Sequence, residues 1–132
     1  MTENVKRYLF LLKIMPKTIN DMTMPMMIIS VVFDYFGIDT SYRTAKVRDH
    51  EIVLSRQVSM YYIKKYTKQS LAGIGSYFQK DHATILHAIK TVNNYIDTDK
   101  KFRCDIERIN NRILSKVMID DHKYDQYDTD RV

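Results

Sequence analysis

The residues best able to do chemistry lie close together in one short segment. DHATILHAIK, residues 81–90, supplies one carboxylate, two imidazoles, one hydroxyl and one ammonium group, on Asp81, His82, His87, Thr84 and Lys90. The two histidines are five residues apart and diverge on a helix, unlike the i, i+4 pair of an HExxH zinc site. These groups therefore suit hydrogen bonding to a polar or anionic partner better than metal binding.

Nothing else in the chain indicates catalysis. The single cysteine, Cys104, has only four scattered histidines as candidate partners, and no GxxxxGK[ST] phosphate loop is present. One cysteine also excludes an internal disulfide, which fits a reducing compartment. We predict that this chain is not an enzyme and that it uses neither a metal nor a cofactor.

A helix beginning after Asp81 would position the polar side chains. The Asp81 carboxylate can accept the free amide hydrogens of a first helical turn. Apolar residues then recur at helical spacing, at Ile85, Ile89, Val92 and Ile96. The opposite arc carries no carboxylate and consists of Ala83, Thr84, His87, Lys90, Thr91 and Asn94. A solvated helix face usually mixes acids with bases, so this arc suits close approach to a polyanion.

A shorter helix is predicted immediately before this one. Residues 70–78, SLAGIGSYF, have Ser70 as a candidate N-cap and apolar side chains at helical spacing. Only two residues separate the segment from Asp81. Two helices joined by so short a turn, the second with an acid-free polar face, form a helix-turn-helix signature.

Two longer helices and one short helix are predicted upstream. Residues 25–36, PMMIISVVFDYF, have proline near the first position and Gly37 as the C-cap. Their expected buried face comprises Ile28, Val31, Val32, Tyr35 and Phe36. A short helix capped by Thr40 or Ser41 follows and ends near Lys46.

The second longer helix covers residues 55–67, after a loop over residues 46–53. Ser55 is its candidate N-cap, and its inward row is Val58, Tyr62 and Tyr66. Arg56 would then lie in the first turn, where a cation is mildly unfavourable. That misfit favours a phosphate contact for Arg56.

Positive charge is concentrated in the middle of the chain. Residues 43–96 carry nine basic and three acidic side chains, whereas residues 1–42 carry four of each and residues 97–132 carry eight basic and nine acidic ones. Localised positive charge is typical of nucleic-acid-binding proteins. The two most apolar runs, residues 8–15 and 24–36, are too short to span a bilayer. We therefore predict a cytoplasmic protein without membrane contact.

Four motifs connect this sequence to a known family. They are KVR at residues 46–48, SRQVSMYYIKKYT at 55–67, SLAGIG at 70–75 and DHATILHA at 81–88. Together they resemble the C-terminal DNA-binding domain of the bacterial replication initiator DnaA, whose most specific motif is DHTTVLHA. The likeness extends back to about Pro25. The family's ATPase domain has no counterpart in this sequence.

The resemblance implies contacts to bases and to phosphates of DNA. The expected base contacts are Arg48 in the minor groove and Asp81, His82, Ala83 and Thr84 in the major groove. The expected phosphate contacts are Lys46, Arg56, Gln57, Lys64, Leu71, Ala72, His87 and Lys90. A solvated loop arginine is the alternative for Arg48, and ordinary surface or half-buried histidines are the alternative for His82 and His87.

Several positions depart from the family pattern. Ala83 replaces a threonine that would touch a base, Thr91 replaces a lysine, and Ala72 stands where proline is usual. The turn before Asp81 is one residue shorter than the common GGRD version. We therefore do not assign the family's nine-base-pair target to this chain.

The two ends of the chain lie outside the resemblance. Residues 1–23 form an N-terminal arm, residues 24–96 the DNA-binding domain, and residues 97–119 a C-terminal amphipathic helix. That helix has an apolar face of Ile106, Ile109, Ile113, Leu114, Val117 and Met118, and it could close the core or pair two subunits. Residues 120–132 contain five acids and two bases, and we predict a disordered tail.

These observations predict an all-α protein of five to six helices built around a helix-turn-helix. The expected function is sequence-specific binding of double-stranded DNA, to regulate replication initiation or transcription. A phage or mobile element is one candidate source. The alternative is a protein–protein assembly module with weak or no DNA binding, since the recognition helix departs from the family pattern. A homodimer through the terminal helices is a further expected assembly.

Overall fold

A computed structural model of the protein describes the backbone of residues 24–129 and the side chains of residues 24–117. This part of the chain is all-α, as predicted, with five α-helices, one 3-10 helix and no strand. The elements are α3 (Met24–Tyr35), η1 (Thr40–Arg43), α4 (His50–Tyr66), α5 (Leu71–Ser76), α6 (His82–Thr98) and α7 (Lys100–Thr129). The expected N-terminal arm, residues 1–23, lies outside the described residues.

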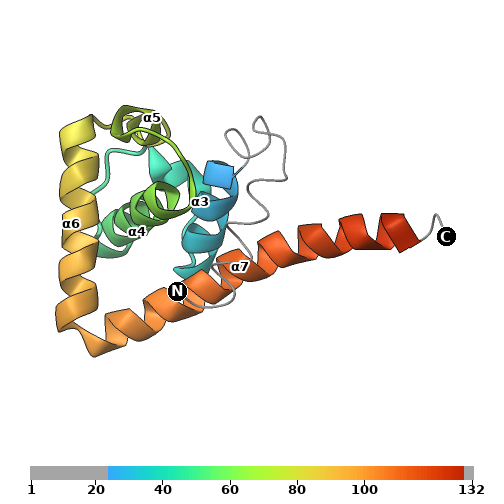
Figure 1. Ribbon diagram of the computed structural model, residues 1–132. Coiled ribbons are helices and arrows are strands. Elements are labelled where there is room, and N and C mark those ends of the chain that lie inside the picture. Colours follow the sequence, from blue (N-terminus) through green and yellow to red (C-terminus); the bar gives the residue numbers. More distant parts are fainter. Residues whose placement is uncertain (1–23, 130–132) are drawn as a thin grey trace.

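The helices pack around α4. Figure 1 shows α6 along one edge, with α5 at its N-terminal end, while α7 leaves the other end and passes beneath α3. Both α3 and α6 pack against α4, and α7 contacts α3 and α6. The distal part of α7 projects beyond the rest of the fold (Figure 1). Within residues 24–129, no helix combines the length and apolarity needed to cross a membrane.

Helix α3 forms where it was expected and ends at Tyr35, and Gly37 caps its C-terminal end. The glycine has φ +69°, and two amide bonds close the end: Gly37 N–H donates to the Asp34 carbonyl at 3.0 Å and Ile38 N–H to Phe33 at 2.9 Å. The expected buried face is partly wrong. Tyr35 is only half-buried, whereas Phe33 is fully buried, because α3 packs against α4, α7 and η1 together.

Helix α4 begins earlier than the sequence indicated. It starts at His50 after Asp49, so Ser55 is an interior residue and not the N-cap. The Ser55 hydroxyl donates to the Glu51 carbonyl at 2.7 Å, one turn back. Ile52 in this extra turn is buried, and burial of an apolar side chain stabilises a helical turn.

The segment before α4 also differs from the prediction. The 3-10 helix η1 is capped by Asp39, whose carboxylate accepts from the Ser41 amide at 2.8 Å, and it ends at Arg43. The cap is therefore Asp39 and not Thr40 or Ser41. The loop consequently covers residues 44–49, shorter than the expected 46–53 at its C-terminal end.

One residue, Asp99, separates α6 from α7. Its amide closes α6 by donating to the Tyr95 carbonyl at 2.8 Å, and its carboxylate accepts from the Phe102 amide at 3.1 Å at the start of α7. Helix α7 then continues to Thr129. The backbone of residues 120–129, for which the sequence predicts a disordered tail, is helical in the structure, and residues 130–132 lie outside the described part.

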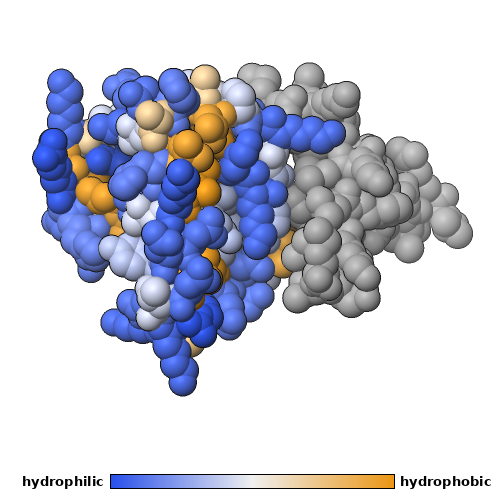
Figure 2. All heavy atoms as spheres, turned by 60° about the vertical axis from the view of Figure 1, so that its left-hand side comes forward, coloured by the Kyte–Doolittle hydropathy of each residue, from blue (hydrophilic) through white to orange (hydrophobic). Residues whose placement is uncertain are grey.

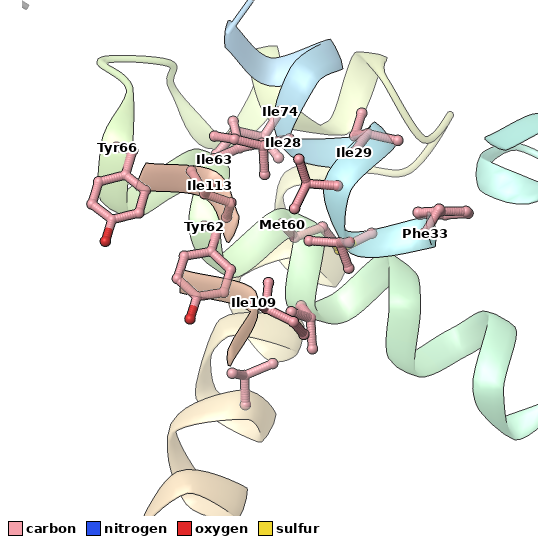
Figure 3. Close-up of a cluster of buried hydrophobic side chains, with 14 of the residues drawn as sticks. Ile28, Ile29, Phe33, Met60, Tyr62, Ile63, Tyr66, Ile74, Ile109 and Ile113 are labelled. Atoms are coloured by element: carbon pink, nitrogen blue, oxygen red, sulfur yellow. The ribbon is translucent and has the colours of Figure 1, made fainter. Parts of the chain in front are cut away.

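Tyrosines fasten α7 to the core (Figure 3). The buried Tyr62 hydroxyl donates to the Ile106 carbonyl at 2.8 Å, and the Tyr66 hydroxyl donates to the Asn110 side chain. The Tyr62 and Tyr66 rings are stacked, with centroids 5.8 Å apart. Burial raises the pKa of Tyr62 and raises that of Tyr66 to about 12. On α7 the apolar side chains Phe102, Ile106, Ile109, Ile113, Leu114 and Val117 are buried, as the sequence predicted for most of them.

Candidate nucleic-acid interface

The turn between α5 and α6 determines the direction in which α6 begins. Ser70 caps α5 as predicted, with its hydroxyl accepting from the Gly73 amide at 3.0 Å. The Lys80 amide donates back to the Gly75 carbonyl at 3.0 Å. A Cβ on Gly75 would lie 2.2 Å from the Lys80 carbonyl oxygen, so glycine is required there. Gln79 completes the turn with φ +55°.

Asp81 caps α6 as the sequence predicted. Its Oδ1 accepts from the Thr84 amide at 2.9 Å and from the Thr84 hydroxyl at 2.6 Å. These two bonds lower the pKa of Asp81 below its ordinary value. The carboxylate is therefore held in place at the exposed N-terminal end of α6.

The outer face of α6 is open to solvent. Ile85, Ala88 and Val92 are buried and hold the helix on the core, while Ile89 and Ile96 are only half-buried. The exposed residues include His82, Ala83, Thr84, His87, Lys90 and Asn94. Apart from its Asp81 cap, the first four turns of α6 contain no acid. Figure 2 shows that this side of the molecule is mainly hydrophilic, with a narrow hydrophobic strip.

Leu86 belongs to this outer face, although the sequence did not single it out. It is 43 % exposed, a large apolar side chain left in solvent. Leu86 lies three residues after Ala83 and four before Lys90, so helical spacing places all three on one face. That spacing was the available signal, but an apolar residue is usually assigned to the core.

The loop over residues 44–49 presents a second group of exposed side chains. Lys46, Val47 and Arg48 are all exposed, with Val47 another apolar residue in solvent. The loop is tied to the helix pair through η1, because Arg43 Nε donates to the Tyr77 carbonyl at 3.1 Å. Tyr77 is the C-cap of α5. The Arg43–Tyr77 hydrogen bond therefore connects the segment that carries the basic loop to the turn before α6.

Arg56 does not occupy the first helical turn, so the reason given for its phosphate contact is wrong. It lies inside α4 and is only 7 % exposed. Its guanidinium donates to the carbonyls of Tyr42, Ala45 and Val47. Burial lowers the pKa of Arg56 from the ordinary arginine value. The side chain thus serves the backbone of the loop.

The other predicted contact residues are distributed over the same assembly. Lys64 near the end of α4 and Ala72 in the first turn of α5 are exposed, whereas Gln57 and Leu71 are half-buried. Lys65 lies between the Tyr61 and Tyr66 rings, at 5.8 Å and 5.6 Å from their centroids. Among the described residues, no group of three histidines, cysteines or carboxylates could hold a metal ion.

The fold and this exposed face define a helix-turn-helix protein, in which α5 supports α6. Residues 25–92 match the family described as bacterial dnaA protein helix-turn-helix. The match covers more than half of the chain, and the protein belongs to this family.

Curated relatives carry the same segment within much longer chains. The chain is 46 % identical over 84 residues to the chromosomal replication initiator protein DnaA of Flavobacterium psychrophilum, covering 63 % of this chain and 18 % of the relative. The DnaA proteins of Bacteroides thetaiotaomicron and Wolbachia pipientis are 39 % and 40 % identical, over 68 % and 59 % of this chain and 19 % and 17 % of their own lengths. The chain therefore spans less than a fifth of these relatives.

Proposed function

We propose that this chain binds double-stranded DNA in a sequence-specific way, with α6 in the major groove. The observation that carries the proposal is the exposed face of α6, which begins at a tight turn and carries no acid between its Asp81 cap and Asp97 in its last turn. Family membership supports it, because a helix-turn-helix typically places its second helix in the major groove.

The first turn of α6 supplies the proposed base contacts. His82 and Ala83 are exposed there, beside Asp81 and Thr84. The Thr84 hydroxyl gives its proton to Asp81, so it meets a base as an acceptor or through its methyl group. Leu86 adds an apolar surface suited to a thymine methyl. This combination favours a target with thymine near the centre of the α6 contact.

The loop and residues of α4, α5 and α6 supply the remaining contacts. We propose Arg48 for the minor groove, because it is exposed on the basic loop. The proposed phosphate contacts are Lys46, Gln57, Lys64, Leu71, Ala72, His87 and Lys90. For Leu71 and Ala72 the group involved is the main-chain amide, since first-turn amides have no helical acceptor.

We extend the proposal to regulation of replication initiation. The curated relatives are chromosomal replication initiator proteins, and they share the helix pair with this chain. Regulation of transcription is the competing outcome. The genomic positions of the bound sequences, at replication origins or at promoters, distinguish the two.

Selection of bound sequences from random duplexes tests the proposal directly. We expect a defined motif to be enriched, and affinity to fall on the order of 10²-fold between 50 and 200 mM salt if about four phosphates are contacted. The double variant His82→Ala, Thr84→Ala should lose the motif while keeping weak, salt-dependent binding. Enrichment of no motif by the wild-type protein would refute sequence-specific binding.

The second candidate function is an assembly module on the same fold. The projecting part of α7 favours it, because this helix extends past the packed body (Figure 1). The homodimer through the terminal helices belongs to this hypothesis. Sedimentation velocity at graded salt distinguishes it: salt-insensitive oligomers that do not retain duplex DNA would replace the first proposal with this one.

A further inference from the structure

Arg56 contacts three main-chain carbonyls that lie on one short stretch of chain. Nε and Nη2 donate to the Tyr42 carbonyl at 3.0 and 2.6 Å, and Nη1 donates to the Val47 carbonyl at 3.1 Å. Nη2 also donates to the Ala45 carbonyl. The planar guanidinium can serve all three because its five N–H donors diverge in a fixed fork.

Because Arg56 is buried, these main-chain carbonyls are its main hydrogen-bond partners. With 7 % of its surface exposed, the side chain has little access to an external phosphate. A buried charge without hydrogen bonds would strongly destabilise the fold. The bonds to the loop carbonyls therefore satisfy the cation and fix the loop.

The fixed stretch ends directly before Arg48. Val47, whose carbonyl Arg56 holds, is the residue preceding Arg48, and both side chains are exposed. At the other end of the stretch, Arg43 ties η1 to the Tyr77 carbonyl, next to the turn that starts α6. Two arginines thus relate the position of the loop to that of α6.

We propose that Arg56 is a positioning residue that holds the 44–49 loop so that Arg48 and α6 can contact one duplex together. This inference rests on the proposed function. It assigns Arg56 a role in the free protein, before any DNA is bound. A direct phosphate contact would instead act only in the complex.

The first test uses the protein without DNA. Backbone amide order parameters of residues 44–49 are measured by NMR in the wild type and in Arg56→Lys, which keeps the charge but loses the planar fork. We expect values near about 0.85 in the wild type and toward about 0.6 in the variant. Lys64→Met removes an exposed cation from the same helix and should leave the loop unchanged. An equally rigid loop in Arg56→Lys overturns the proposal.

The second test is a double-mutant cycle on a selected duplex. Arg48→Ala should weaken binding about tenfold in the wild-type background. In the Arg56→Lys background it should cost less than about threefold, because a loop that is no longer held cannot place Arg48. Additive losses overturn the proposal, because independent contacts of Arg48 and Arg56 with the duplex would contribute separately.

If Arg56→Lys does not fold, a second variant, Arg43→Lys, still tests the proposal. Arg43→Lys removes the bond to the Tyr77 carbonyl from a half-buried side chain. It should show the same non-additivity with Arg48→Ala, to a smaller extent, and additivity again counts against positioning. If the wild type binds no duplex, the proposed function fails, while the loop order parameters still decide whether Arg56 holds the loop.

Discussion

Helices α6 and α7 are consecutive in the chain, but they differ in how many side chains they bury and in the charges they expose. In α6 the fully buried side chains are Ile85, Ala88 and Val92, and the outer arc is small, polar and basic. In α7 the buried set is larger and includes Ile109 and Ile113, while its exposed face mixes bases with acids.

The difference indicates that α7 contributes mainly to the core, whereas α6 presents its outer face to solvent. A mixed exposed face such as that of α7 is the usual solvated surface of a packed helix. Helix α6 is held by its three buried side chains and by its two ends, the turn after Gly75 and the joint at Asp99. Substitutions on the outer face of α6 should therefore change binding, and substitutions under α7 should change stability.

The sharpest test of this comparison pairs Ile109→Ala in α7 with Leu86→Ala in α6. Ile109 is fully buried, so its truncation should lower the free energy of unfolding by about 2–5 kcal/mol. Leu86 is exposed, so its truncation should change stability by no more than about 0.5 kcal/mol and weaken duplex binding. Denaturant unfolding and duplex titration measure the two effects. Equal losses of stability would remove the distinction.

Gly75→Ala tests how strongly the placement of α6 depends on its turn. The added Cβ would meet the Lys80 main chain, so the turn must shift at a cost of about 1–3 kcal/mol. Gly37→Ala is the control, because it meets no atom within 4 Å and carries only the strain of its positive φ, about 1 kcal/mol. Thermal unfolding compares them. A smaller cost at Gly75 than at Gly37 would contradict this view of the turn.

Gln79→Gly should act in the opposite direction. Gln79 has φ +55°, a conformation that glycine adopts without steric cost. We expect a gain of at most about 1 kcal/mol, reduced by the greater freedom of glycine in the unfolded chain. Duplex affinity should stay unchanged, since the substitution relieves strain without moving α6. Any loss of stability would mean that the glutamine side chain supports the turn.

Asp81→Asn should give the smallest change, visible only in acid. The folded-state pKa of Asp81 lies below its ordinary value of 3.8, so its contribution to stability is present above that pH and is lost as pH falls through the folded-state pKa. Asparagine is also a good N-cap, so the variant should match the wild type near neutral pH and flatten this acid dependence. Unfolding between pH 2 and 7, with Asp97→Asn as the charge control, measures it.

Local signals in the sequence identified much of this arrangement. The caps at Ser70 and Asp81 and the C-cap glycine at position 37 are confirmed, because each depends on residues within one turn. The inward row of Val58, Tyr62 and Tyr66 is confirmed for the same reason. The contacts proposed for DNA stay predictions.

Two of the misses depend on how a residue is buried in the folded chain. Ser55 resembled a cap, yet burial of Ile52 extends α4 in front of it. Arg56 resembled a first-turn cation, but its acceptors lie up to 14 residues away and belong to a loop. A serine before an arginine and glutamine therefore does not indicate an N-cap where a preceding apolar residue is buried, as Ile52 is here.

The hydrogen bond between Tyr62 and α7 determines which substitutions α7 tolerates at this contact. The hydroxyl donates to the main-chain oxygen of Ile106, so the bond requires no particular side chain at that position. Mutations that exchange one apolar residue for another at position 106 leave the anchor intact. The contact of Tyr62 with α7 therefore constrains the position of the α7 main chain at residue 106 and not the identity of the side chain there.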